Sequence, residues 1–382
     1  MPAMLMRMSI CLVLLSACAS APSGRSEQGR SPYPMSRYVR QVTWDFSAVA
    51  AHRRAHGSDL WPCTWAADRN LYCAWGDGGG FDGDDDHIGR VSLGFARIEG
   101  VPTATGAGAF RGKNVWGDAP KYAEAAATFG GKVGSMISVR GKLYAYGALW
   151  TEADVAKPTL KSGAGPVHRL IWSEDLGRTW QIAPWENQHV SWFLNFGPDN
   201  AGAPDGLVYI YYRRPDEAAN VYLARVAPEQ LTADPRTSSA YQYLTGADRR
   251  GRPGRWSASE SDARAVFSDP AGAEVAVVYD APLRRYLMTA AHNPGGQELT
   301  ASAGQVALFE GVHPWGPWKT IGYYDHWGNL GPESYGDYLG LVLPVKWISA
   351  DGRTVWGIFS SMGQYDSFNL VKMTLSTSWW AR

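Results

Sequence analysis

The sequence has little net charge, little helical periodicity and few cysteines. Among its 382 residues, 36 Lys and Arg balance 36 Asp and Glu, and four residues are Cys. A balanced chain has no basic footprint for nucleic acid, so we expect no nucleic-acid partner. Apolar positions alternate as in strands instead of recurring with the period of a helix. After the N-terminal segment, no apolar run reaches the length of a membrane span.

Common metal-site spacings are also missing. His52, His56 and His87 do not form an HExxH motif. The acidic loop from Asp82 to Asp86 has oxygen ligands dense enough for Ca²⁺, but its spacing differs from that of an EF-hand. We interpret it as a solvated acidic loop. We therefore assign no metal and no cofactor.

The N-terminus has the pattern of a bacterial lipoprotein signal. One positive charge, Arg7, precedes an apolar core that ends at Leu15 and is too short to span a bilayer. Residues 15–18, LSAC, fit a lipobox, which predicts cleavage before Cys18 and a lipid on its thiol. An ordinary signal cleaved slightly later is the alternative. We expect a signal peptide over 1–17, a flexible tether over 18–40 and one domain over 41–382, in a monomer anchored by lipid to the bacterial cell envelope.

One pattern recurs five times along the chain. A turn residue, an aromatic and alternating apolar positions recur at 70–75, 141–146, 206–211, 284–288 and 352–356. First strands of the same hairpins are expected at 136–139, 193–197, 275–279 and 343–348, and third strands at 168–173, 220–226, 304–310 and 368–375. This repetition predicts an all-β fold, a five-bladed β-propeller. A two-domain β-sandwich is the alternative, but it does not explain the regular recurrence.

A second motif agrees with a propeller. Ser173 to Trp180, SEDLGRTW, matches the sialidase-type Asp-box S-x-D-x-G-x-T-W. In that hairpin turn the Ser and Asp bond turn amides and the Trp packs between strands. We therefore expect Asp175 in an outer turn, away from the active site.

Two carboxylates are placed at the ends of one expected hairpin. Asp59 precedes the run WPCTWA, residues 67–70 turn the chain, and LYCAW leads into Asp77. The hairpin puts both acids at the same end of two adjacent strands. Glycoside hydrolysis needs such a pair, one acid to protonate the leaving oxygen and one to activate water or attack. The alternative is turn chemistry at both positions.

Further candidates are placed by the propeller interpretation, in which the first strand of each blade lines a central tunnel. Glu333 is the candidate third catalytic carboxylate. Asn195, Arg264 and Lys346 lie near inner strands and are candidates for substrate binding. An ordinary ion pair is the alternative for Glu333 and Arg264. The hairpin tryptophans, Trp61 and Trp75, are candidates for stacking on sugar rings.

Two cysteines lie symmetrically about the turn of the same hairpin. Cys63 and Cys73 are either a cross-strand disulfide or two small buried residues.

Several segments together resemble a bacterial propeller family that was long a domain of unknown function and now includes D-arabinan-degrading glycoside hydrolases. They are SDLWPCTWAADRNLYCAWGDGGGF, VSLGFARIEG, WSEDLGRTW, FLNFGPDNAG, PWGPW and VKWISADGRT, and the likeness covers about residues 55–376. The resemblance implies catalytic roles for Asp59 and Asp77. It suggests a surface-tethered glycoside hydrolase acting on a polysaccharide such as a D-arabinan. A non-catalytic carbohydrate-binding or scaffold propeller is the alternative, and an exo-sialidase is a weaker one.

Overall fold

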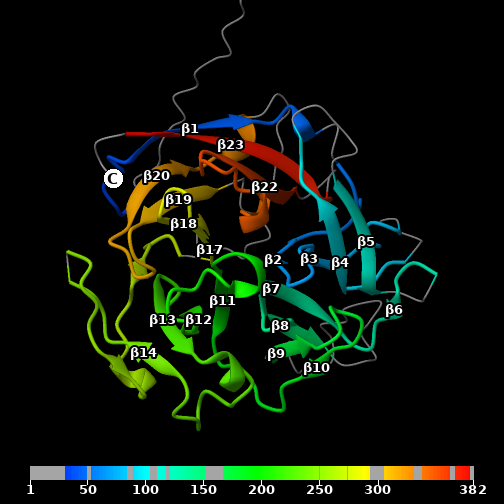
Figure 1. Cartoon of the computed structure of the whole chain (residues 1–382), viewed down its shortest axis with the longest axis horizontal. Coiled ribbons are helices and arrows are strands. Elements are labelled where there is room, and N and C mark those ends of the chain that lie inside the picture. The colour runs from blue at the N-terminus through cyan, green and yellow to red at the C-terminus, as the bar shows by residue number, and fades with distance from the viewer. Residues whose placement is uncertain are drawn as a thin grey trace, which may run out of the picture.

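The structure is a computed structural model (Figure 1). It describes residues 31–49, 53–83, 89–103, 110–117, 121–150, 167–248, 250–272, 274–292, 305–330, 338–361 and 366–378. Cys18, Glu333, His52 and residues 84–88 of the acidic loop lie outside the described residues. Among those that are described, no helix is long and apolar enough to cross a membrane.

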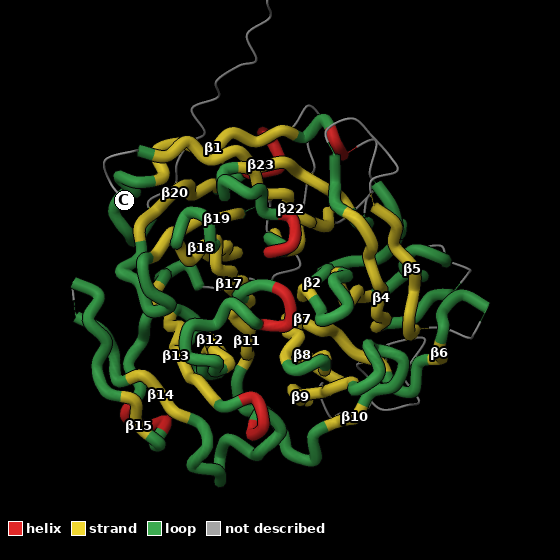
Figure 2. The backbone as a smooth tube through the Cα atoms, in the orientation of Figure 1, coloured by secondary structure: helices red, strands yellow, loops and turns green. Residues whose placement is uncertain are grey.

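The fold is all-β, as the sequence predicts. In the described part of the chain the strands form five successive antiparallel meanders, which Figures 1 and 2 show arranged around one centre. The first meander contains β2 (Cys63–Trp65), β3 (Leu71–Gly76), β4 (Leu93–Gly100) and β5 (Phe110–Gly117), with β6 (Ala125–Ala126) added in parallel. The second contains β7 (Gly130–Val139), β8 (Lys142–Trp150), β9 (Val167–Ser173) and β10 (Gln181–Ile182). The third contains β11 (Val190–Asn195), β12 (Val208–Arg213), β13 (Asn220–Val226), β14 (Gln242–Leu244) and β15 (Trp256–Ser257), with β16 (Phe267–Ser268) beside β13.

The last two meanders continue the same order from the inside outward. They are β17 (Glu274–Asp280), β18 (Arg285–Ala291), β19 (Val306–Gly311) and β20 (Lys319–Tyr324); and β21 (Tyr338–Val342), β22 (Thr354–Ser361), β23 (Asn369–Thr377) and β1 (Val39–Asp45). A short parallel contact between β11 and β17 joins the third and fourth meanders into one sheet. Short 3₁₀ helices follow several strands: η2 (Pro198–Asn200), η3 (Pro228–Gln230), η4 (Glu260–Asp262), η6 (Trp327–Leu330) and η7 (Val345–Trp347).

Apolar side chains fill the spaces between neighbouring meanders. Five buried clusters lie between successive pairs, and one of them joins the fifth meander to the first through Trp356 and Trp61. The middle strands are therefore covered on both faces. All six residues of β3 are buried, which explains why its sequence is a nearly continuous apolar run.

The N-terminal segment completes the last meander. Strand β1 pairs with β23, with Val42 opposite Leu375. Ahead of it, Tyr33 stacks on Phe267 with ring centres 5.1 Å apart, and the Ser31 hydroxyl lies 2.6 Å from that of Thr320. The expected tether boundary at residue 40 is therefore wrong, because residues 31–40 already belong to the folded domain.

One inner strand differs from its predicted position. The fifth inner strand is β21, whereas residues 343–348 were expected to form it. Pro344 lies within that expected strand and has no N–H to give to a ladder. It stands instead at the start of η7.

Two local features lie in the first hairpin and in the turn after β9. Cys63 and Cys73 face each other across β2 and β3 and form a disulfide, with Cα atoms 4.1 Å apart. In the turn after β9, Asp175 accepts hydrogen bonds from the Thr179 amide at 2.8 Å and from the Ser173 hydroxyl at 2.8 Å. Trp180 stacks on Phe95 with ring centres 4.0 Å apart, so this turn is fixed to the first meander.

Candidate active site

The first hairpin brings Asp59 and Asp77 to one end of its two strands. The Asp59 amide donates to the Gly76 carbonyl at 2.7 Å, and the Gly76 amide donates back to the Asp59 carbonyl at 2.9 Å. This bridge extends the β2–β3 ladder beyond Cys63. Asp77 follows directly, so both carboxylates leave the sheet at the same edge.

A lysine from the next meander joins the two carboxylates. Lys132, near the start of β7, places its Nζ 3.2 Å from Asp59 Oδ1 and 3.0 Å from Asp77 Oδ1. Two oxygens bound to one nitrogen at these distances are separated by at most about 6.2 Å. No sequence motif marks Lys132, and the first strand expected for this meander begins only at Met136, four residues later.

The backbone around the pair is held in uncommon conformations. Leu60, Trp61 and Asp77 have φ values of 73°, 56° and 52°, in the left-handed region where each non-glycine residue costs roughly 1–3 kcal/mol. Gly76 leaves the room that the ion pair occupies, since a Cβ there would lie 2.2 Å from Asp59 Oδ1 and 2.4 Å from Lys132 Nζ. A larger residue at this position would therefore have to displace the ion pair.

The glycine-rich loop after Asp77 is ordered by polar side chains. Asn114 accepts from the Phe81 amide at 2.9 Å and donates to the Gly79 carbonyl at 2.8 Å. Asp82 in turn accepts from the Asn114 amide at 2.7 Å. Asp82 thus has a structural contact, and among the described residues no group of three or more His, Cys, Asp and Glu is arranged to hold a metal ion.

A third carboxylate approaches from the fifth meander. Asp366 lies just before β23, and its carbonyl accepts from the Gly57 amide at 2.6 Å. Burial, reinforced by the negative charge of Asp59, raises the pKa of Asp366 to about 6. Its Oδ1 is buried without a hydrogen-bond partner in the described part of the chain. No sequence motif marks this residue.

Burial also raises the pKa of the Asp59 carboxyl. The positive charge of Lys132 lowers this pKa, but by less than burial raises it. The side chain of Asp59 is only 11% exposed, compared with 31% for Asp77. The site therefore combines a buried carboxyl that retains a proton more readily with a more accessible carboxylate beside the same cation.

The cluster borders the space at the centre of the molecule. All five inner strands line a central cavity through residues such as Thr64, Met136, Asn195, Val277 and Val342. Nearer the carboxylates, one cavity of about 150 Å³ contacts Leu60 and Glu274, and another of about 190 Å³ contacts Lys132. A small ligand in either cavity would lie beside residues that contact or adjoin the carboxylate pair.

The two hairpin tryptophans do not face this space. Trp61 is 0% and Trp75 1% exposed, and their rings stack on each other with centres 6.1 Å apart. Both belong to the cluster that packs the first meander against the fifth. The prediction that they stack on sugar rings is therefore wrong for this structure, because neither has an exposed ring face.

Three other predicted binding residues lie away from the carboxylates. Asn195 uses its amide to bind Thr64 Oγ1 and the Met136 carbonyl, so it ties three inner strands together inside the cavity. Arg264 donates to the Ala263 carbonyl at 2.9 Å, near the outer loops of the third meander.

Lys346 lies at the opposite end of the hairpin. Burial lowers the pKa of Lys346, and the negative charge of Asp68, in the turn between β2 and β3, partly opposes that decrease. Among the described residues, no contact joins any of these three side chains to Asp59 or Asp77, and their roles in substrate binding stay predictions. Glu333 lies outside the described residues.

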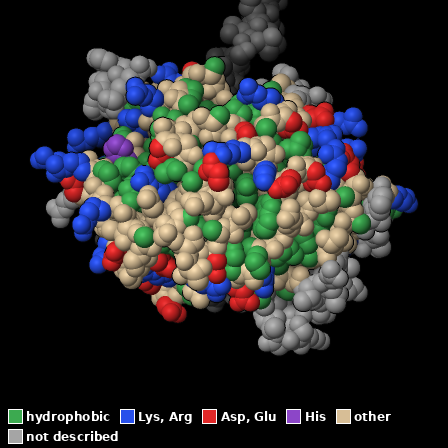
Figure 3. Space-filling model, turned by 60° about the horizontal axis from the view of Figure 1, so that its bottom comes forward, with side chains coloured by type: hydrophobic (Ala, Val, Ile, Leu, Met, Phe, Trp, Pro, Cys, Tyr) green, Lys and Arg blue, Asp and Glu red, His purple; other side chains and the backbone are tan. Residues whose placement is uncertain are grey.

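The space-filling view shows how charge is distributed around the fold. On the face in Figure 3, Lys and Arg side chains are interspersed with Asp and Glu, in keeping with 36 charges of each sign. Neither sign dominates this face.

Solved structures with a similar course of the chain include glycoside hydrolases. A hydrolase candidate from Bacteroides ovatus is 12% identical, with 87% of this chain and 90% of that chain covered and a TM-score of 0.48. A GH43_1 enzyme from Xanthomonas citri is 13% identical, with 87% and 95% covered and a score of 0.44. The structure of the GH43_1 enzyme complexed with xylotriose is 14% identical, with 86% of this chain and 90% of that chain covered and a TM-score of 0.43. Scores below 0.5 at such identities assign neither fold nor activity to this chain.

Sequence comparison gives the family. No curated protein matches the chain significantly. Residues 159–371 match the profile of a family described as a domain of unknown function, DUF4185. The matched span contains Glu274 and Asp366, and it begins after Asp59, Asp77 and Lys132. Because it covers more than half of the sequence, the chain belongs to the DUF4185 family.

Proposed function

We propose that this protein is a glycoside hydrolase in which Asp59 and Asp77 act as the catalytic pair. The observation that carries the proposal is the position of these two carboxylates, held by Lys132 beside the central cavities and joined by a third carboxyl, Asp366. Glycoside hydrolysis divides proton donation and nucleophilic or base action between two carboxyls with different environments. The described residues supply that difference.

The environments favour a role for each acid. Asp59 is the better proton donor, because burial raises its pKa and keeps it protonated to higher pH. Asp77 is more exposed and pairs closely with Lys132, which suits a nucleophile or base. Both carboxyls lie beside the same ammonium group, so they face one space in which a glycosidic bond can be placed between acid and base or nucleophile.

The substrate and the fold are part of the same proposal. The resemblance in the sequence supports a polysaccharide substrate such as a D-arabinan, hydrolysed by a chain anchored to the cell envelope through Cys18. The five meanders, with apolar clusters between each neighbouring pair, support a five-bladed β-propeller, and the hydrogen bonds of Asp175 support an Asp-box. A central cavity lined by all five inner strands is consistent with that arrangement.

The test is hydrolysis by the full chain and its variants. Arabinan, arabinogalactan and xylan are incubated with the protein, products are sized, and NMR follows the anomer released first. Asp59→Asn and Asp77→Asn should each lower turnover by at least about a hundredfold, because Asn neither exchanges a proton nor attacks. Asp216→Asn, on an exposed loop, is the matched control and should leave turnover unchanged.

Two results would contradict the proposal. Normal hydrolysis by Asp59→Asn would remove Asp59 from catalysis, and normal hydrolysis by Asp77→Asn would remove Asp77. Tight glycan binding without any hydrolysis would favour the second candidate, a carbohydrate-binding protein in which the carboxylates only bind sugar hydroxyls.

A further inference from the structure

A side cavity opens from the carboxylate cluster toward the second and third meanders. It has a volume of about 190 Å³, the liquid volume of roughly six water molecules. Its floor is a cross-strand row in which Lys132 pairs with Ala148 and Ala148 with His168. Directly paired residues lie on the same face of a sheet, so the small Ala148 leaves a gap between the two larger side chains.

The wall beside His168 carries groups that suit hydroxyls. The Asn187 amide donates to the His168 carbonyl at 2.8 Å, and the Asn187 side chain donates to Ser191 Oγ at 2.9 Å. Ser191 thus accepts one bond and keeps its own proton to donate. Both Asn187 and Ser191 line the cavity. A ligand hydroxyl that accepts from Ser191 would complete this chain of hydrogen bonds.

His168 itself adds a second hydroxyl partner. Its ring has no hydrogen bond to any of the described residues. Burial, and then the charge of Arg213, lowers the pKa of His168, which keeps the imidazole neutral near pH 7. A neutral imidazole has one donor and one acceptor nitrogen. A sugar hydroxyl, which both donates and accepts, matches such a group better than a fixed charge does.

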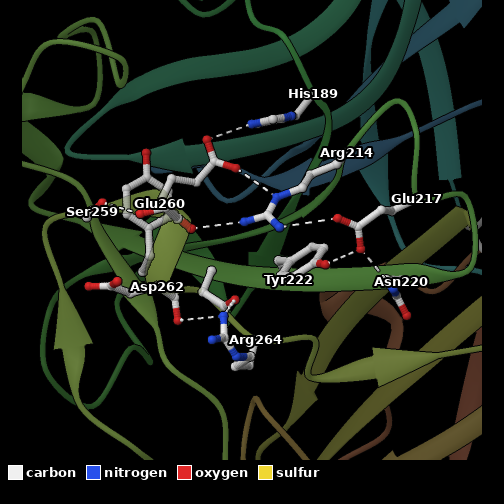
Figure 4. Close-up of polar contacts among 12 residues, drawn as sticks. His189, Arg214, Glu217, Asn220, Tyr222, Ser259, Glu260, Asp262 and Arg264 are labelled. Atoms are coloured by element: carbon white, nitrogen blue, oxygen red, sulfur yellow. Dashed lines mark hydrogen bonds and ion pairs between the residues drawn. The ribbon is translucent and has the colours of Figure 1, made fainter.

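A polar network behind the cavity holds another lining residue, His189. Its Nε2 lies 3.0 Å from Glu260, which also accepts from Arg214 Nε at 3.0 Å, and Arg214 Nη1 donates to Glu217 at 3.2 Å (Figure 4). The hydrogen bond from His189 lowers the pKa of Glu260 and keeps it ionised. Glu260 therefore accepts from Nε2. These contacts make the wall a rigid support for a ligand.

Charge around the cavity selects against an anionic ligand. Lys132 already contacts two carboxylates, and Glu274, which also lines the cavity, lies 4.0 Å from Arg213. Each of these two cations thus has a carboxylate partner. A carboxylated sugar would add a negative charge beside Asp59 and Asp77 with neither cation free to balance it.

We propose that the cavity lined by Lys132, Ala148, His168, Asn187, Ser191 and Glu274 binds one uncharged glycosyl unit, a neutral pentose or hexose, next to the catalytic carboxylates. The proposal rests on the proposed function for its place in a glycan substrate. It adds which kind of sugar unit is accepted, and it names His168 and Ser191 as residues that contact its hydroxyls.

The experiment measures sugar binding at the ring of His168. The full chain is titrated with D-arabinose, L-arabinose, D-xylose, D-glucose and D-galactose, and with D-glucuronate as the charged counterpart of D-glucose. The ring NMR signals of His168 are assigned by their loss in His168→Asn, and calorimetry gives the affinities. At least one neutral sugar should shift these signals, and D-glucuronate should bind at least roughly tenfold more weakly than D-glucose, because its charge is unbalanced.

Two variants test the cavity and one controls for folding. Ala148→Leu fills the gap on the floor and should weaken binding of the neutral sugar at least roughly tenfold. Ser191→Ala removes one donor, keeps the backbone, and should weaken binding several-fold even if the larger substitution impairs folding. Ala218→Leu, on an exposed loop, adds the same side chain elsewhere and should leave binding unchanged.

The outcomes separate this proposal from the proposed activity. Absence of any neutral-sugar shift at His168, equal binding of D-glucuronate and D-glucose, or unchanged binding by folded Ala148→Leu and Ser191→Ala would each overturn the subsite. Hydrolysis that depends on Asp59, with an unaltered KM in Ala148→Leu, would support the proposed hydrolase and overturn the subsite. Sugar binding at His168 without hydrolysis would support the subsite and overturn the proposed hydrolase.

Discussion

Replacement of Lys132 by methionine tests whether its charge holds the carboxylate pair together. Methionine has a similar length and no charge, so Lys132→Met leaves Asp59 and Asp77 facing each other across at most about 6.2 Å. At an effective dielectric constant of about 20, two unit charges about 6 Å apart repel by roughly 3 kcal/mol. Lys132 offsets this repulsion in the wild-type protein and methionine does not, so the pKa of Asp59 rises further in the variant.

The pH dependence of stability follows from the sign of this change. In Lys132→Met the folded state binds a proton that the unfolded chain has already released, so stability is lost as the pH rises from about 4 through the raised pKa. We expect a loss of about 3 kcal/mol in the free energy of unfolding at pH 8, shrinking to under about 1 kcal/mol near pH 4. Urea denaturation across this pH range measures both values.

A matched substitution separates charge from packing. Lys142→Met removes an exposed lysine that pairs with Glu174, and water and salt screen such surface pairs. Its effect on the free energy of unfolding should be small at both pH 4 and pH 8. An equal loss for Lys132→Met at pH 4 and pH 8 would refute the electrostatic argument and indicate that Lys132 acts through packing.

Two further predictions concern distant parts of the chain. Burial raises the pKa of Asp280 to about 7, so the free energy of unfolding falls as the pH rises from about 4 to 7. Asp280→Asn removes this titration and should reduce that fall by up to about 4 kcal/mol. Denaturation of both proteins at pH 5 and pH 8 measures it, and parallel losses would contradict the prediction. Cys18→Ala should release the protein from bacterial membranes, because the lipobox predicts that this thiol carries the lipid. Fractionation followed by immunoblotting tests this, and a variant that still sediments with membranes would contradict the lipoprotein assignment.

Features encoded within one hairpin could be predicted from the sequence. The nearly continuous apolar runs of β3 and β8 follow from strands covered on both faces, and each strand carries its own signal. The closeness of Asp59 to Asp77 also depends only on the single turn between β2 and β3. The strand predicted over 343–348 does not form, because Pro344 has no N–H for a strand ladder and stands at the start of η7.

Side-chain direction could not be read from the same pattern. Trp61 and Trp75 occur at strand ends, where a tryptophan facing a cleft and one packed between sheets have the same sequence context. The left-handed backbone at Leu60 and Trp61 helps to decide the matter, because it changes the course of the chain just after Asp59. No alternation rule predicts that turn, and Trp61 ends in the cluster shared with the fifth meander.

The remaining site residues depend on contacts between meanders. Lys132 comes from the second meander and Asp366 from the fifth, whereas Asp59 and Asp77 belong to the first. The fifth meander is completed by β1, so the residues that precede the first hairpin help to place Asp366 beside it. The pKa of Asp366 is raised by burial and by Asp59 together, and neither cause exists until the first and fifth meanders pack. The carboxylate cluster therefore depends on the packing of the first meander against the fifth. A variant that detaches β1 should displace Asp366 from Asp59 under conditions in which the β2–β3 hairpin is still folded.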